Sequence, residues 1–240
     1  MSLSFEDKGK CIAKLGKQLI CIDNSNNKGL KVIEAKKLNE KFTQVPSISG
    51  RESIYISGAS GSGKSTYAAD YIRNYKKIYP DNNVYLLSKV KNDPAFETLE
   101  GITVIDPELF DDDETDFNSD QFSNCLILFD DIDQLNDKIR KKVTFLRDQL
   151  LETGRHNDVF VISTSHLITN YKQSRILLNE ANSVTFFPAS GWYHIKRYLE
   201  QYVGLSKDEI HKIKNTKSRW VTIFQQFPTV VMQEKKIYIP

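Results

Sequence analysis

The distribution of apolar residues along the chain predicts short buried strands that alternate with amphipathic helices. Almost continuously apolar runs occur at residues 54–57, 84–88, 102–105, 126–129, 159–162 and 183–187. A strand that is buried on both faces of a sheet has this pattern. Apolar residues spaced three and four apart predict helices at 68–79 and 134–152, and a further helix is expected at 172–181. Strands and helices in this order predict an α/β fold.

The same pattern divides the chain into three parts. Residues 1–50 contain short apolar runs between glycine- and asparagine-rich turns, which predicts a small strand-rich segment that ends in a polar linker at 36–50. Residues 51–190 contain the strands and helices of the expected core. Residues 191–240 form an extension with two expected helices and then two expected strands, at 192–202, 206–214, 219–226 and 230–238.

Composition and charge narrow the class of protein. The 240 residues are 40% hydrophobic and 27% charged, as in ordinary globular proteins. We see no apolar run of the roughly 18 residues that a membrane span needs, and no signal-peptide pattern. Cys11, Cys21 and Cys125 have no metal-ligand spacing, and their odd number favours a reducing compartment, so we expect an intracellular protein with structural thiols. The net charge of +2 permits a DNA partner without arguing for one.

Two stretches permit more than one interpretation. Residues 106–120 are acidic and have few apolar side chains, which favours a solvated surface loop over a metal site. Residues 192–202 mix aromatic and basic side chains. Such a mixture is compatible with contacts to the DNA backbone, but an amphipathic helix packed on the sheet has the same composition, and we favour packing.

Residues 58–65 read GASGSGKS and match the phosphate-loop spacing G-x-x-x-x-G-K-[ST]. The glycines lack a Cβ, so backbone N–H groups can turn inward and, with the positive end of the following helix, hold a polyphosphate. Lys64 is expected to reach the β- and γ-phosphates, and the Ser65 hydroxyl to bind Mg²⁺. The residues expected to contact the nucleotide are Gly58, Ala59, Ser60, Gly61, Ser62, Gly63, Lys64, Ser65 and Thr66.

Two carboxylates follow the buried run at 126–129. Ligands of open α/β sheets bind at the carboxyl ends of the strands, so Asp130 and Asp131 should face the bound phosphates. We expect Asp130 to hold the Mg²⁺ shell and Asp131 to orient or deprotonate an attacking water. The alternative is that the acidic pair only caps a turn or a helix.

His166 and Arg155 lie at opposite ends of the strand expected at 159–162. His166 ends that strand on the nucleotide side, where it is either a γ-phosphate sensor or an ordinary turn histidine. About six residues at ~3.3 Å each separate the two ends, roughly 20 Å. Arg155 therefore does not reach the nucleotide of its own chain. It is either an arginine finger for a neighbouring subunit or a cation at the negative end of the preceding helix.

The order of these motifs resembles the viral DNA-packaging ATPases of the FtsK–HerA superfamily, in particular the poxvirus-type and giant-virus branch. GASGSGKS, LILFDD, a helix that ends in GRH and a strand that ends in STSH carry the resemblance, over residues 50–190. It implies a P-loop NTPase of the additional-strand type, with a mostly parallel sheet in the order 5-1-4-3-2 and helices on both faces.

The resemblance also implies a function. These proteins are ATPases with Mg²⁺ that form homo-oligomeric rings of five or six subunits and pump double-stranded DNA into a capsid. By this likeness Lys64 and Ser65 match Walker A, Asp130 and Asp131 match Walker B, and Arg155 looks like the finger between subunits. His166 stands where relatives often have glutamine. The expected partners are DNA and capsid or virion-membrane proteins, and the expected location is the host cytoplasm, where virions assemble, or the virion itself.

Two other functions remain open. A small-molecule kinase of the nucleoside or nucleotide type uses the same loop on a chain of similar size, and would not respond to DNA. A non-catalytic ATP-dependent switch for assembly would bind ATP without appreciable turnover. ATP hydrolysis measured with and without duplex DNA distinguishes the three.

Overall fold

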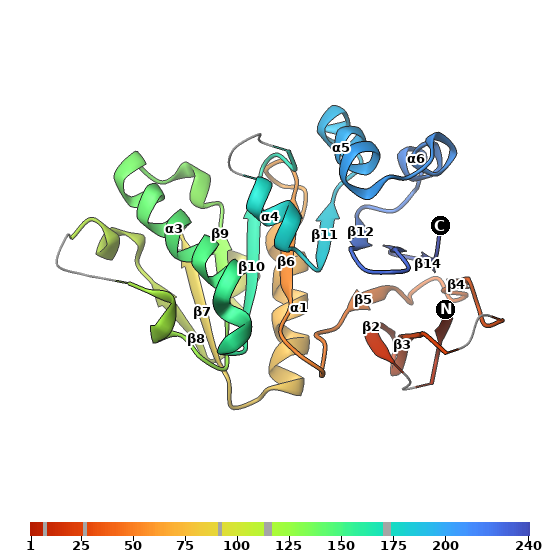
Figure 1. The fold of residues 1–240 in the computed structure, drawn as a ribbon, viewed down its shortest axis with the longest axis horizontal. Coiled ribbons are helices and arrows are strands. Elements are labelled where there is room, and N and C mark those ends of the chain that lie inside the picture. The colour runs from red at the N-terminus through yellow and green to blue at the C-terminus, as the bar shows by residue number, and fades with distance from the viewer. Residues whose placement is uncertain (7–8, 26–27, 91–92, 113–116, 170–173) are drawn as a thin grey trace.

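A computed structural model describes residues 1–6, 9–25, 28–90, 93–112, 117–169 and 174–240 (Figure 1). Its strands are β1 (Ser2–Ser4), β2 (Lys10–Leu15), β3 (Gln18–Asp23), β4 (Val32–Glu34), β5 (Phe42–Gln44), β6 (Ser53–Ser57), β7 (Asn83–Ser88), β8 (Ile102–Ile105), β9 (Cys125–Asp130), β10 (Val159–Ser165), β11 (Ser183–Phe186), β12 (Val221–Phe224), β13 (Val230–Gln233) and β14 (Lys236–Tyr238). Its α-helices are α1 (Lys64–Ile78), α2 (Pro94–Glu97), α3 (Asp137–Thr153), α4 (Arg175–Glu180), α5 (Trp192–Tyr198) and α6 (Lys207–Lys214).

The central part of the larger sheet is parallel. Its strands pair in the order β11-β6-β10-β9-β7-β8. β6, which precedes the glycine-rich loop, therefore lies between β10 and β11, and β9 lies between β10 and β7. The order expected from the resemblance, 5-1-4-3-2, has five strands. The structure has a further parallel strand, β8, at the edge beside β7.

Helices cover both faces of these parallel strands. Successive residues of a strand point to opposite faces. In β6, Ile54 and Ile56 belong to the apolar cluster that contains the buried face of α1, whereas Tyr55 belongs to the cluster that contains α3. Residues of β9 alternate in the same way. This double coverage is the reason that the strands read as continuous apolar runs, and it confirms the predicted α/β class.

Antiparallel strands extend the sheet beyond β11. β12, β13, β14 and β4 follow one another there, and β4 comes from the N-terminal part of the chain. The prediction of a single strand at 230–238 is wrong. The chain folds back at Glu234 and Lys235 and forms the hairpin of β13 and β14. We refer to β13, β14 and the turn between them as the C-terminal hairpin.

The N-terminal strands form a second sheet, in the order β1-β3-β2-β5. Because β5 lies within 36–50, the prediction of a plain linker is wrong for that part. Ile12, Ile20 and Phe42 of this sheet share an apolar cluster with Phe224 and Met232. Figure 1 shows this sheet beneath the C-terminal strands, at the end of the molecule away from β8.

The cysteines differ from expectation. Cys11 and Cys21 face each other across β2 and β3 and form a disulfide, so the expectation of three thiols is wrong for these two. Cys125 at the start of β9 is a buried free thiol, and burial raises its pKa to about 12. A thiol with so high a pKa is unreactive near neutral pH, in keeping with a structural role.

The acidic stretch at 106–120 is more than a solvated loop. Residues 113–116 lie outside the described residues. On either side of them, Phe110 is 2% exposed and Phe117 stacks on it with ring centroids 4.4 Å apart. Lys138 of α3 forms an ion pair with Asp111 at 3.1 Å. The aromatic residues therefore fasten this stretch to the core, which composition alone did not indicate.

The remaining helices lie near their expected positions. Residues 172–173 of the helix expected at 172–181 lie outside the described residues, and α4 begins at Arg175. α5 continues into a π-helix at Leu199–Val203 and packs through Ile195 and Tyr198, while Tyr193 is 73% exposed. Within the described ranges, no helix is both long and apolar enough to cross a membrane.

Candidate functional site

The glycine-rich loop joins the buried strand β6 to α1. Gly61 and Gly63 have φ angles of +72° and +111°, in the left-handed region that favours glycine. A Cβ on Gly58 would lie 2.6 Å from the side chains of Phe187 and Ser62, so this position also requires glycine. α1 begins at Lys64. The first N–H groups of a helix have no partner within it, so Ser65 and Thr66 present donors and positive partial charge at the loop.

Lys64 is buried and points back across the loop. Its ammonium donates to the carbonyl oxygen of Gly58 at 3.0 Å and lies 3.5 Å from Oδ2 of Asp131. Only 5% of the residue is exposed. The expected Walker A lysine and the second expected Walker B aspartate are therefore in direct electrostatic contact at the carboxyl ends of the strands, although β10 separates β6 from β9.

Asp130 lies at the carboxyl end of β9 and is 2% exposed. The Thr164 hydroxyl donates to its Oδ1 at 2.8 Å, and the Ser88 hydroxyl donates to its Oδ2 at 3.0 Å. Burial raises the pKa of Asp130 and outweighs the lowering effect of these two hydrogen bonds, while the charge of Asp131 raises it further. β7 and β10, the neighbours of β9, thus hold both oxygens of the carboxylate in place.

Asp131 follows in an uncommon backbone conformation. Its φ is +44°, in the left-handed region, where aspartate is among the few side chains that are tolerated. Its backbone N–H donates to the Thr164 hydroxyl at 2.9 Å. The carboxylate turns toward Lys64 and toward His166, whose Nε2 lies 3.5 Å from Oδ2 of Asp131. The structure therefore brings Lys64, Asp130, Asp131 and His166 together.

Gln134 is a member of this group that the sequence did not reveal. It ends the short 3-10 helix Ile132–Gln134, and its side-chain nitrogen lies 2.9 Å from Nε2 of His166. The amide donates in this pair, so Nε2 of the imidazole accepts. Its position three residues after Asp131 in the sequence carries no motif, and only the turn of the chain places it beside the histidine.

These side chains line a cavity of about 650 Å³ over the loop, within the usual size range of ligand sites. Ser60, Gly61, Gly63, Ser65 and Thr66 line it from the loop, and Asp93 lines it from the start of α2. Burial of a lysine and a carboxylate beside an open cavity is an arrangement that binds charged ligands. Phosphates fit the N-terminus of α1, the Lys64 ammonium and the backbone N–H groups of the loop. A cation fits the carboxylate of Asp130.

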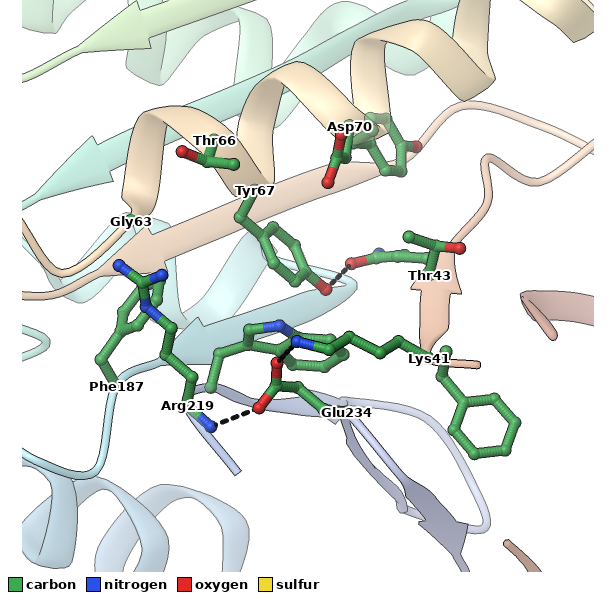
Figure 2. A pocket seen from close by; sticks show the side chains of 13 residues that line it. Lys41, Thr43, Gly63, Thr66, Tyr67, Asp70, Phe187, Arg219 and Glu234 are labelled. Carbon is green, nitrogen blue, oxygen red and sulfur yellow. Dashed lines mark hydrogen bonds and ion pairs between the residues drawn. The ribbon is translucent and has the colours of Figure 1, made fainter. Parts of the chain in front are cut away.

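Arg219 is the second residue that the sequence did not single out. It lies just before β12, and its Nε donates to the carbonyl oxygen of Ser62 at 3.0 Å. Figure 2 shows it near Gly63 and Phe187, at the side of a smaller cavity of about 190 Å³ between α1, the C-terminal hairpin and Lys41. Arg219 lines both cavities.

Arg155 lies away from this group. It belongs to the 3-10 helix Gly154–His156 at the amino end of β10, whereas His166 follows the carboxyl end of the same strand. The side chain is exposed. The structure thus places Arg155 where the sequence predicted, at the opposite end of the sheet from the other candidate residues.

Comparison with known proteins identifies a relative by sequence. No family model matches the chain. The uncharacterized protein V3 of Sputnik virophage is 45% identical over 198 residues, which make up 81% of this chain and 79% of V3. Identity at this level over most of both chains reflects common descent.

Solved structures with the same fold are NTPases. The genome packaging NTPase B204 of Sulfolobus turreted icosahedral virus 2, in complex with ATP-gammaS, has a TM-score of 0.50 at 15% identity, over 79% of this chain and 97% of B204. The cytoplasmic domain of the type VII secretion ATPase EccC of Thermomonospora curvata has a TM-score of 0.51 at 14% identity, over 96% of this chain and 29% of EccC. These likenesses show that the chain has the α/β fold of P-loop NTPases.

Proposed function

The chain belongs to the same family as protein V3 of Sputnik virophage, and we propose that it is a Mg²⁺-dependent ATPase that drives packaging of a double-stranded DNA genome. The convergence of Lys64, Asp130 and Asp131 on one cavity over the loop is the observation that carries the proposal. The shared fold with B204, described as a genome packaging NTPase, supports the packaging role.

ATP is the proposed nucleotide. Residues 58–66 hold its phosphates through backbone N–H groups and the positive end of α1. Lys64 exchanges its contact with Asp131 for the β- and γ-phosphates. This exchange matters for the chemistry, because it releases the carboxylate of Asp131 at the moment that the triphosphate binds.

The residues that would hold Mg²⁺ suit that ion. Ser65 supplies a hydroxyl and Asp130 a carboxylate, and Mg²⁺ prefers such oxygen ligands together with water and phosphate oxygens. In the described residues, no cluster of three or more histidine, cysteine or acidic side chains is arranged to hold a metal ion without help. Two protein ligands beside a triphosphate fit the sparse protein coordination that is usual for Mg²⁺ in ATPases. When bound, the ion neutralises charge on the β- and γ-phosphates.

Hydrolysis then depends on positioning. Asp131 orients and deprotonates the attacking water, and its left-handed backbone aims the carboxylate into the cavity. His166, held by Gln134, lies beside that carboxylate and senses the γ-phosphate. Arg155, exposed at the far end of β10, completes the site of a neighbouring subunit in a ring. These roles, with the ring, FtsK–HerA membership and its poxvirus-type branch, are parts of the proposal.

The location and the partners follow from the same proposal. A packaging motor assembles at the site of virion formation in the host cytoplasm and contacts capsid or virion-membrane proteins. It converts ATP turnover into movement of double-stranded DNA. A nucleoside kinase or a non-catalytic switch would share the phosphate loop but not the response to DNA.

The experiment is ATP hydrolysis by the full chain with Mg²⁺, with and without duplex DNA, alongside the mass of the protein in solution. We expect hydrolysis that duplex DNA stimulates, DNA binding that weakens steeply as salt rises, and a ring-sized assembly. Turnover only on addition of a nucleoside points to the kinase. ATP binding without turnover, with or without DNA, points to the switch.

A further inference from the structure

We propose that Arg219 is a nucleotide-binding residue: its guanidinium contacts the phosphate chain of the bound nucleotide and ties the nucleotide to the C-terminal hairpin. This inference rests on the proposed ATP-binding function. It adds a cation of the same chain that lies outside the phosphate-loop motif, 157 positions from the loop residue that it contacts.

The side chain of Arg219 lies directly over the phosphate-binding turn. Besides the hydrogen bond to Ser62, its Nη2 and Cζ lie 3.3 Å and 3.5 Å from the position that a Cβ on Gly63 would occupy. Gly63 has no side chain, so the guanidinium rests against bare backbone at the point where the loop becomes α1. Phosphates held by that backbone lie within reach of the guanidinium.

Among the described residues, the guanidinium of Arg219 forms no ion pair, although its charge contributes to the lowered pKa of Glu234. In the part of the chain that the structure describes, its Nη1 and Nη2 groups have no hydrogen-bond acceptor and no carboxylate within ion-pair distance. A guanidinium has a planar fork of N–H donors that matches two phosphate oxygens. Arg219 shares the larger cavity with Lys64, Ser65 and Asp131, so a phosphate chain there meets both cations.

The backbone of Arg219 is fastened on its other side. Its N–H donates to Oε2 of Glu234 at 2.7 Å, and Lys41 contacts Oε1 of the same carboxylate at 2.5 Å (Figure 2). The Ser218 hydroxyl accepts from the N–H of Glu234 at 2.9 Å. Burial acts to raise the pKa of Glu234, but the Arg219 N–H and Lys41 outweigh it and hold that pKa below its usual value.

Glu234 therefore connects three segments that are distant in sequence: the residues before β12, the turn of the C-terminal hairpin, and Lys41 beside β5. A phosphate bound to the guanidinium is connected through the backbone of Arg219 to Glu234 and to Lys41. Without the phosphate, the only hydrogen bond of the guanidinium to a described residue is the one to the Ser62 carbonyl, while the backbone N–H keeps its bond to Glu234. Arg219 and Glu234 therefore link a nucleotide bound at the loop to the C-terminal hairpin.

The test compares Arg219→Gln, Arg219→Lys and Arg219→Ala with the wild-type chain, and Lys217→Ala serves as the control that removes a neighbouring exposed cation. Calorimetric titration with ATP and with inorganic pyrophosphate, which has no nucleoside, measures binding. Glutamine can still donate to the Ser62 carbonyl but carries no charge. We expect Arg219→Gln and Arg219→Ala to weaken both ligands by roughly tenfold to a hundredfold, Arg219→Lys to weaken them less, and Lys217→Ala to bind as wild type.

Salt dependence separates a phosphate contact from a structural one. Wild-type affinity for pyrophosphate should fall more steeply with ionic strength than that of Arg219→Gln, because one charge contact is missing in the variant. If Arg219→Gln binds as tightly as wild type and only Arg219→Ala is weak, Arg219 merely supports the loop and the inference is wrong. If the wild-type chain binds neither ligand, the proposed function fails as well.

Discussion

The two ends of the parallel sheet both bury charged residues, but they use them differently. At the amino ends, Glu52 is 2% exposed and accepts from Lys10, from the Tyr71 hydroxyl and from the Ser47 N–H, at 3.0–3.2 Å. Arg51 donates to the carbonyl oxygens of Leu150 and Leu151 at the end of α3. Both charged groups are therefore paired with other groups of the protein and stabilise the fold.

At the carboxyl ends, the charges face a cavity instead. Lys64 and Asp131 contact each other at 3.5 Å, longer than a good ion-pair hydrogen bond, and both line open space. Asp130 has a raised pKa and, within the described residues, no cation within ion-pair distance. Burial of a carboxylate without a cationic partner is costly even where hydroxyl groups donate to it, and a bound cation or other charged ligand would reduce that cost. Substitutions at the two ends should therefore separate activity from stability.

Arg155 is the exception that can break this comparison, since we assign function to a residue at the amino end. Arg155→Ala should lower ATP turnover by about 10³–10⁵ if the residue is a finger, with ATP binding close to wild type. Lys141→Ala, which removes an exposed cation of α3, is the matched control. ATPase rates and calorimetry measure both effects.

Mixing variants makes the test of Arg155 sharper. Lys64→Ala lacks a nucleotide-holding lysine but keeps Arg155, so a ring that also contains Arg155→Ala subunits should recover part of the lost turnover. Recovery requires the arginine to act across subunits. An unchanged rate in Arg155→Ala alone removes the assignment and leaves the amino end purely structural.

Asp131→Asn should have the next largest effect. Loss of the carboxylate that directs water should lower single-turnover hydrolysis by about 10²–10⁴, while ATP binds at least as well because Lys64 no longer has a competing partner. Asp137→Asn, at the exposed start of α3, serves as the control. Hydrolysis at the wild-type rate would show that another group activates the water.

Glu52→Ala tests the amino end. Removal of this carboxylate leaves Lys10 and the Tyr71 hydroxyl without their buried acceptor, and we expect a loss of about 1–3 kcal/mol in the free energy of unfolding. The melting temperature should fall by ~2–4 °C for each kcal/mol, with the Kd for ATP unchanged in the folded protein. Glu40→Ala, which removes only the surface pair with Lys37, should cost at most about 1 kcal/mol. A higher Kd for ATP in Glu52→Ala would show that the amino and carboxyl ends of the sheet are coupled.

The sequence alone predicted the positions of the loop and of the acidic pair in the fold, because each motif is contiguous and its backbone context is local. Gly58 to Ser65 and the pair Asp130–Asp131 follow the carboxyl ends of two parallel strands, β6 and β9, which flank β10, and the apolar runs around them made both strands visible in the sequence. Arg219 and Gln134 belong to no sequence motif. Arg219 reaches the loop because β12, which follows it, pairs with β11, a strand distant in sequence from the loop. The disulfide of Cys11 with Cys21 depends in the same way on the register of β2 against β3.

Asp130→Asn should have the smallest effect on stability, and an unusual sign. Because the folded-state pKa of Asp130 is raised above its ordinary value of 3.8, the folded protein binds a proton more tightly than the unfolded chain. The contribution of Asp130 to stability is therefore present at pH below 3.8 and is lost as pH rises through the raised pKa. Asparagine removes this penalty, so the variant should melt higher than wild type at neutral pH, and the difference should shrink on acidification.

Loss of Mg²⁺-dependent turnover should accompany this gain, since asparagine is a poorer ligand for the ion. Thermal melts at several pH values, with and without Mg²⁺, measure the effect. A variant that melts lower at neutral pH would show that the carboxylate is satisfied in the absence of ligand. The two ends of the sheet would then not differ in the way described above.

Equilibrium binding of ATP with Mg²⁺ to the wild-type chain and to Lys64→Ala tests the central claim most directly. The account predicts one site per chain in the wild type, weakened by at least a hundredfold when the lysine that faces Asp131 is removed. Equal affinities in the two proteins, or no binding by the wild type, would contradict the assignment of the cavity over Gly58–Ser65 as a nucleotide site.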